Sequence, residues 1–130
     1  MSARLDYPAA VEGTPGTVHV CGNFTTAGAA SPTVFSSGPF SVARTGSGTY
    51  VVTFKENFNE FLSGDCRILD ATGSTKVAYI RSGASAPNPG TGTTNASITI
   101  ETQTVAGTIG DLTGPIISFD INWRKGALRK

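Results

Sequence analysis

The chain has 130 residues, of which 38% are hydrophobic and only 15% are charged, and its formal net charge is +1. This length predicts one domain whose core buries about two-thirds of the unfolded surface, so folding does not need disulfides. A charge this close to zero, without a basic stripe, argues against nucleic-acid binding. No segment approaches the roughly eighteen apolar residues that a membrane helix needs.

Residues 1–16 contain two prolines and two glycines and show neither a helical nor a strand period. They predict an N-terminal arm, which is either a disordered terminus or a strap that becomes ordered against a partner. The arm has no apolar run, so we expect no signal peptide. We therefore expect synthesis in a reducing cytoplasm, with Cys21 and Cys66 as free thiols.

Alternation with a period of two predicts a half-buried strand at Thr17–Cys21, with its two valines on one face. A hairpin is predicted over residues 40–54. Its second strand has an apolar face that consists of Tyr50, Val52 and Phe54. The connection RTGSGT supplies Gly46 and Gly48, which can adopt the positive φ of a tight turn.

Residues 54–62 are the one stretch with helical spacing. The apolar positions i, i+4, i+7 and i+8 are Phe54, Phe58, Phe61 and Leu62. The pattern predicts one or two helical turns at most, which end at Gly64. The aromatic rings are better explained as a plug in the core than as a ligand site.

Two further strands, over residues 66–71 and 76–82, are predicted to pair with each other around the turn TGST. The next segment, residues 83–95, holds three glycines and two prolines. It therefore predicts an exposed loop, of the kind on which a rigid sandwich carries its contacts.

The last two strands alternate most clearly. In residues 96–103, Ile98 and Ile100 are expected inward, whereas Thr99 and Glu101 are expected outward. The inward face of the final strand, residues 115–123, consists of Ile117, Phe119, Ile121 and Trp123. Each of these large side chains contributes about 1.5–3 kcal/mol if it is buried.

The pattern as a whole gives seven or eight short strands, at most one short helical turn and no helix that could carry a parallel crossover. It predicts an all-β fold, an antiparallel β-sandwich or jelly roll, over residues 17–124. Residues 125–130 are a basic C-terminal tail. The tail is either a solvated end or an anchor onto an acidic protein surface.

The sequence gives little indication of a nucleophilic catalytic site or of a metal site. His19 is the only histidine, and no serine lies in a G-x-S-x-G elbow. His19 and Cys21 point the same way from a strand, but two ligands do not make a metal site. We therefore expect no catalytic residue, no cofactor and no metal.

The carboxylates are scattered along the chain. Asp65 with Asp70, and Asp120 with Glu101, are pairs that could meet in space. Nothing in the sequence raises either pair to a glycosidase dyad, which needs two carboxyl groups at a defined separation. The chain is therefore not expected to be an enzyme.

Sugar binding is an alternative, because β-sandwiches often bind glycans on exposed aromatic rings. Trp123 shares the apolar face of the final strand and is better explained as core. Tyr7 and Tyr79 are the remaining aromatic candidates. This alternative predicts a receptor-binding head or tail-fibre domain that recognises a host glycan.

Within residues 38–124, one set of segments carries a family resemblance. These are GPFSVARTGSGTYVVTF, DCRILDA, KVAYIRS, ASITIETQ and IISFDINWR. Together they resemble the head-decoration, or cement, proteins found beside the major capsid protein of tailed bacteriophages. The order of the terminal strands is also similar to that of trimeric C1q/TNF-type jelly rolls.

The resemblance implies a jelly-roll protomer without catalytic residues that assembles as a homotrimer. It also implies a virion protein on the capsid exterior, with the major capsid protein as partner. The candidate residues for contact with the capsid or with another subunit lie in the arm, in the loop and around the junction of the last strand with the tail. They are Arg4, Tyr7, Asn88, Asn95, Arg124 and Lys125. Three weak contacts on one rigid body would bind together far more tightly than one.

Overall fold

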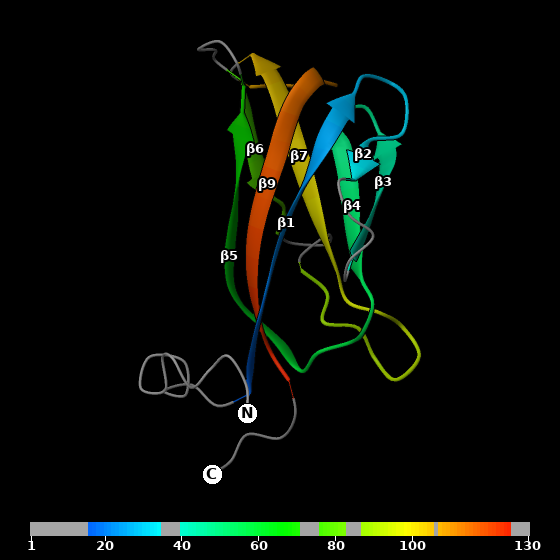
Figure 1. Ribbon diagram of the computed structural model, residues 1–130, viewed down its shortest axis with the longest axis vertical. Helices are drawn as coiled ribbons and strands as arrows, with labels where there is room; N and C mark the ends of the chain where they lie inside the picture. Colours follow the sequence, from blue (N-terminus) through cyan, green and yellow to red (C-terminus); the bar gives the residue numbers. More distant parts are fainter. Residues whose placement is uncertain (1–15, 35–39, 71–75, 83–86, 106, 126–130) are drawn as a thin grey trace.

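The computed structural model describes residues 16–34, 40–70, 76–82, 87–105 and 107–125. Within them the chain forms nine β-strands in two antiparallel sheets, and no helix (Figure 1). The predicted all-β antiparallel sandwich is therefore confirmed. The strand count exceeds seven or eight because two of the nine strands are only two residues long.

Sheet A, the four-stranded layer, has the order β2-β1-β9-β5. Its strands are β1 (Thr17–Ala27), β2 (Thr33–Val34), β5 (Glu60–Leu69) and β9 (Thr113–Arg124). The long strands β1 and β9 pair from Thr17 opposite Arg124 to Ala27 opposite Thr113. The predicted inward face of β9 is confirmed, because all four of its large side chains are at most 1% exposed.

Sheet B has the order β3-β4-β7-β6, with β8 beside β7. Its strands are β3 (Phe40–Gly46), β4 (Thr49–Phe54), β6 (Val77–Ile80), β7 (Ser97–Val105) and β8 (Thr108–Ile109). The predicted hairpin is confirmed as β3–β4. Of its two glycines only Gly48 has a positive φ, 65°, and a Cβ there would lie 2.7 Å from the carbonyl oxygen of Gly110. Gly48 is therefore the position that requires glycine.

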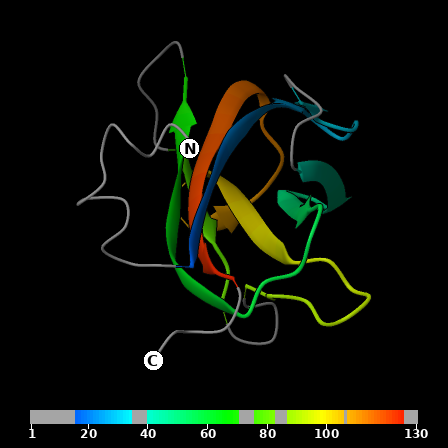
Figure 2. The same ribbon diagram turned by 60° about the horizontal axis from the view of Figure 1, so that its bottom comes forward.

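The two sheets pack face to face around one apolar core (Figure 2). Trp123 lies in this core, where it stacks on Phe58 with 4.9 Å between ring centroids and meets Phe54 edge-on at 5.5 Å. Ring pairs of this kind add about 0.5–1.5 kcal/mol to the burial of apolar area. Trp123 is thus a core residue, as predicted, and its ring cannot stack on a sugar.

The predicted helical turn is wrong, because residues 55–59 form no helix and β5 follows them directly. The backbone N–H of Phe58 donates to the carbonyl of Pro89, and that of Asn59 donates to the carbonyl of Arg124, both at 2.7 Å. Acceptors from distant segments thus replace the i−4 carbonyls that a helix would supply. The aromatic rings of this segment nevertheless fill the core, as predicted.

The predicted pairing of residues 66–71 with residues 76–82 is also wrong. The first segment lies mostly in β5, which pairs with β9 in sheet A, whereas the second contains β6, which pairs with β7 in sheet B. The chain changes sheet between the two strands. Consecutive strands are neighbours in only about two-thirds of cases, and here the alternation of each strand gave no sign of its true partner.

The start of β1 and the end of β9 meet at one end of the sandwich, drawn at the bottom of Figure 1, which we call the lower end. There the N–H of Lys125 donates to the carbonyl of Gly16 at 2.7 Å. The loops of residues 55–59 and 87–96 lie at the same end (Figure 1). At the opposite, upper end, the turn after β1 meets the connection before β9, because the N–H of Gly28 donates to the carbonyl of Leu112 at 2.8 Å.

Candidate functional site

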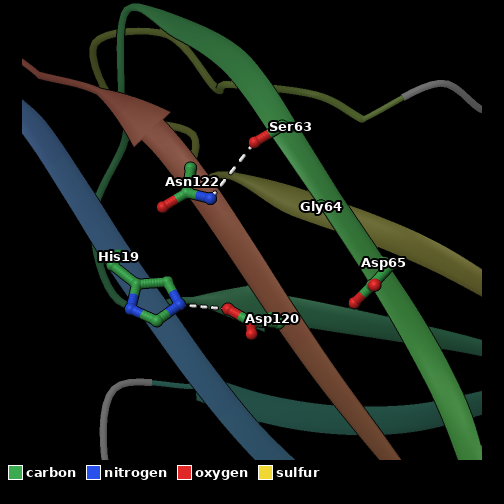
Figure 3. Close-up of a pocket in the computed structure, with 6 residues that line it drawn as sticks. All are labelled: His19, Ser63, Gly64, Asp65, Asp120 and Asn122. Carbon is green, nitrogen blue, oxygen red and sulfur yellow. Dashed lines mark hydrogen bonds and ion pairs between the residues drawn. The ribbon is translucent and has the colours of Figure 1, made fainter.

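An open, polar hollow of about 490 Å³ lies on the outer face of sheet A. Figure 3 shows that β1, β9 and β5 each contribute to it. Its lining consists of His19, Ser63, Gly64, Asp65, Asp120 and Asn122. No large apolar side chain is among these residues, so the hollow offers hydrogen-bonding groups and charge rather than an apolar surface.

Strand register explains why these side chains meet. The inward residues of β9 have odd numbers, so Asp120 and Asn122 face outward. Asp65 lies opposite Asp120, and His19 lies opposite Asn122. A register shift in β5 just before Ser63 brings that residue opposite Asn122 as well.

Two side-chain contacts cross the hollow (Figure 3). Nε2 of His19 donates to Oδ1 of Asp120, and Nδ2 of Asn122 donates to Oγ of Ser63 at 3.1 Å. The side chains of His19 and Asp120 are 53% and 42% exposed. A side-chain contact this open to water contributes at most about 1 kcal/mol to stability.

The hollow does not assemble a Ser–His–Asp triad. His19 on β1 and Ser63 on β5 flank β9, so two strand spacings, about 10 Å, separate them. A nucleophile and its base must approach to about 2.6–3.2 Å. The hydroxyl of Ser63 is instead held by the amide of Asn122.

The structure brings together a carboxylate pair that the sequence did not suggest. Asp120 lies opposite Asp65, whereas Glu101 belongs to β7 in the other sheet, so the pair of Asp120 with Glu101 does not form. Asp65 and Asp70 are five residues apart on extended chain, about 16 Å. Asp65 and Asp120 could have been matched only if residues 60–69 were known to pair with the final strand. The alternation of polar and apolar residues within one strand does not identify its partner strand.

Cys21 and Cys66 are free thiols, as predicted, and they lie on opposite faces of sheet A. Cys21 is exposed and lies opposite Asp120, beside the hollow. Cys66 lies opposite Phe119 and faces the core, where burial raises its pKa to about 12. In the described part of the chain, no group of three or more His, Cys, Asp or Glu residues could hold a metal ion.

The predicted contact residues fall at the lower end wherever they are described. These residues are Asn88, Asn95, Arg124 and Lys125. Arg4 and Tyr7 lie outside the described residues, with nearly all of the predicted arm and tail. The arm and the tail join the sandwich at Gly16 and Lys125, which are hydrogen-bonded to each other at this end.

Hydrogen bonds hold the two loops of the lower end together. The N–H of Ala96 donates to the carbonyl of Glu56 at 3.0 Å, and Nδ2 of Asn57 donates to the carbonyl of Thr91 at 2.9 Å. Residues 91–95 are nevertheless exposed and consist of three threonines, a glycine and an asparagine. The lower end therefore presents hydroxyl and amide groups on a backbone that is fixed from behind.

The basic groups of the lower end are engaged within the chain. Nζ of Lys125 donates to the carbonyl of Asn57 at 2.6 Å, lies 3.4 Å from the carboxylate of Glu56 and sits 5.6 Å from the ring centroid of Phe58. The guanidinium of Arg124 forms an ion pair with Glu60. These contacts fix both side chains in place while leaving part of each exposed to solvent.

Tyr79, the aromatic candidate for sugar stacking, lies on the outer face of sheet B and is 37% exposed. Its hydroxyl donates to Oε1 of Glu101 at 2.6 Å. Glu101 does point outward as predicted, but the residue is only 8% exposed. Tyr79 is therefore far from the hollow, on the other sheet, and no polar group of the hollow can assist it.

No family model, no curated protein and no solved structure matches the chain. No helix in the described ranges is long and apolar enough to cross a lipid bilayer. Two surfaces are distinctive so far, the polar hollow on sheet A and the hydrogen-bonded lower end.

Proposed function

We propose that this chain is a non-enzymatic decoration protein that binds the exterior of a tailed-bacteriophage capsid as a homotrimer, with its lower end against the major capsid protein. The observation that carries the proposal is the clustering at the lower end. Asn88, Asn95, Arg124 and Lys125 were selected from separate stretches of the sequence, and the fold gathers them at one end. The arm joins the sandwich at this same end.

The physical argument is one of repeated weak contacts. An uncharged loop of threonine, glycine and asparagine offers short-range hydrogen bonds and no long-range attraction. A contact worth about 4 kcal/mol binds only at millimolar strength. Three such contacts on one rigid body engage at high effective concentration, so the assembly binds far more tightly than one protomer. The hydrogen bonds behind the loop reduce the entropy lost on binding.

The proposal predicts that Asn95→Arg weakens attachment to capsids. Purified heads that lack the protein would be mixed with wild-type or variant chain, and the bound fraction would be measured by co-sedimentation. The bulky charge should lower the affinity at least about tenfold, because each protomer of the trimer carries it. Bound wild-type protein should also raise the temperature at which the heads break.

Ser31→Arg is the matched control, because Ser31 is exposed like Asn95 but lies next to the turn at the upper end. It should bind like wild type. Heads that neither bind the wild-type chain nor gain heat stability would contradict the proposal. Loss of binding with Ser31→Arg rather than Asn95→Arg would show that the wrong end was chosen.

A glycan-recognising domain is a second candidate, favoured by the hollow on sheet A. Carboxylate, amide and hydroxyl groups, as in Asp65, Asn122 and Ser63, are suitable partners for sugar hydroxyls. The lining has no Trp, Tyr or Phe ring on which a sugar could stack, which makes this candidate the weaker one. A reproducible hit on a glycan array that Asn122→Ala abolishes and Tyr79→Ala retains would support it.

A further inference from the structure

The outer face of sheet B carries very little charge. On β3 and β4 the outward side chains include Ser41, Ala43, Thr49, Val51 and Thr53. The neighbouring strand β7 continues this face with serine and threonine. Small, uncharged side chains of this kind let another protein surface approach closely, and depletion of charge is typical of the centre of a protein interface.

Three large apolar side chains are exposed together on this face. Val77 and Ile109 lie on either side of Gln103 in the register, and Tyr79 lies beside Glu101 in the next row. Their exposed fractions are 45% for Val77, 46% for Ile109 and 37% for Tyr79. We call this group the β6–β8 patch. The remaining large exposed hydrophobic residue in the described ranges, Leu69, is on the outer face of sheet A.

Glu101 is the single carboxylate that the described residues place on this face, and it is already neutralised within the chain. Oε1 of Glu101 accepts from the hydroxyl of Tyr79 at 2.6 Å, and Oε2 lies 3.2 Å from Nη1 of Arg81. The side chain of Glu101 is only 10% exposed. Covering this group would therefore remove little water from it, and the face as a whole is neutral.

We infer that the outer face of sheet B, centred on the β6–β8 patch, packs against a second copy of this chain. A neutral face can pack against a neighbouring copy without like-charge repulsion, and in a trimer this face of one protomer would contact a different surface of the next protomer. It offers no electrostatic attraction to a partner that carries net charge. The outer face of sheet A lacks this property, since it exposes Glu60, Asp65, Arg67 and Asp120.

The proposed function, on which the inference rests, is compatible with this geometry. If the lower end sits on the capsid, the faces of both sheets stand to the side, where the neighbouring protomers of an oligomer must be. The β6–β8 patch lies on a sheet face and not among the loops of the lower end, because β6 and β8 both pair with β7 within sheet B. Self-association and capsid binding would therefore use different surfaces.

The test compares Val77→Asp with Leu69→Asp. The two positions are almost equally exposed, 45% and 49%, but they lie on the outer faces of opposite sheets. Sedimentation of the full chain at high micromolar concentration should give an oligomer for wild type and for Leu69→Asp. An unpaired carboxylate in the interface should weaken self-association of Val77→Asp about 100-fold or more. Circular dichroism would check that both variants are folded.

A thiol-protection measurement covers the case in which Val77→Asp does not fold. Thr99→Cys places a thiol on the outer face of sheet B, while native Cys21 reports on the outer face of sheet A. In the oligomer a maleimide should label Cys21 readily and the introduced thiol slowly. Equal labelling of both thiols, or protection of Cys21 alone, would overturn the inference.

The outcomes also separate this inference from the proposed function. A wild-type chain that stays monomeric at high micromolar concentration, yet binds heads in a way that Asn95→Arg disrupts, overturns the inference and leaves the capsid contact standing. An oligomer that Val77→Asp dissociates, but that binds no heads, supports the inference and removes the proposed function. Capture of a different protein by the outer face of sheet B, with the chain itself monomeric, would also overturn the inference.

Discussion

The outer faces of the two sheets occupy equivalent positions in the sandwich but differ in chemistry. On sheet A the outward residues of β5 and β9 include acids and an arginine, and a polar hollow opens between the strands. On sheet B the outward residues of β4 and β7 are mostly serine, threonine and valine. The strands of both sheets show the same alternation of inward and outward side chains. Alternation alone therefore identifies which side chains are buried, but not what the outer face of a sheet binds.

A carboxylate on each face makes the difference concrete. The side chain of Asp120, on sheet A, is 42% exposed and paired with His19, whereas that of Glu101, on sheet B, is 10% exposed and held by Tyr79 and Arg81. Water solvates the first group, and protein solvates the second. A carboxylate that is solvated by water, such as Asp120, indicates a surface that stays exposed to solvent. A carboxylate that is already covered by protein, such as Glu101, is compatible with a surface that becomes buried in an interface.

The largest expected effect contrasts the inner and outer sides of sheet A. Phe119→Ala should lower the free energy of unfolding by about 3–5 kcal/mol, because it leaves a cavity in a closely packed core. Phe119 is 1% exposed and meets Phe40 edge-on at 4.9 Å. Asp120→Ala, one residue along, should change it by at most about 1 kcal/mol. Urea denaturation measures both, and a loss under about 1 kcal/mol for Phe119→Ala would show that the faces of β9 are inverted.

An intermediate effect contrasts the outer faces directly. Glu101→Ala removes the acceptor of the Tyr79 hydroxyl and the partner of Arg81, and should cost about 1–2 kcal/mol. Asp65→Ala removes a carboxylate that is 64% exposed on sheet A and should cost at most about 0.5 kcal/mol. Denaturation of the two variants side by side measures the difference. Equal losses of unfolding free energy in the two variants would mean that Glu101 on sheet B is no more strongly stabilised than Asp65 on sheet A.

The smallest expected effect is a dependence on pH at the upper end. The guanidinium of Arg44 and the N–H of Gly48 hold the pKa of Asp111 below its usual value of 3.8. Because this pKa is depressed in the folded state, the stabilisation is present above pH 3.8 and is lost as the pH falls further. Asp111→Asn should therefore be less stable than wild type at neutral pH.

The difference between Asp111→Asn and wild type should then shrink as the pH falls below 3.8. Thermal unfolding across pH 2.5–7 measures it, in the range where carboxylates of the folded chain titrate (about pH 2–5). Asp65→Asn, on the exposed face of sheet A, serves as the control. If the difference in thermal stability between Asp111→Asn and wild type stayed constant down to the lowest pH, Asp111 would not be the group responsible for the pH dependence.

The inward faces of the strands could be predicted because burial repeats along the chain. Ile98 and Ile100, like the inward residues of β9, follow a period of two and are at most 1% exposed. The helical prediction for residues 54–62 failed because the burial of their aromatic rings does not come from a helix. Phe54 and Phe58 are buried and Phe61 is partly buried, but their spacing spans an irregular connection between β4 and β5 that happens to match a helical period.

The polar hollow and the β6–β8 patch could not be predicted, because each depends on which strands are neighbours. The hollow needs β5 beside β9, and the patch needs β6 and β8 on either side of β7. Tyr79 and Glu101 are 22 residues apart, yet their side chains bond. Pairing between distant strands is decided by how the two faces pack, and no short window of sequence contains that information.

The position of β9 has a consequence for how the chain acquires its structure. β9 lies between β1 and β5, which do not pair with each other, and it is the last described strand to be synthesised. Sheet B uses only residues 40–109 and can form earlier, whereas sheet A stays in separate pieces until β9 arrives. Contacts this distant in sequence slow folding. Until the final strand is complete, β1 therefore lacks its main strand partner, although the ring of Phe24 packs on Tyr50 of sheet B at 5.2 Å.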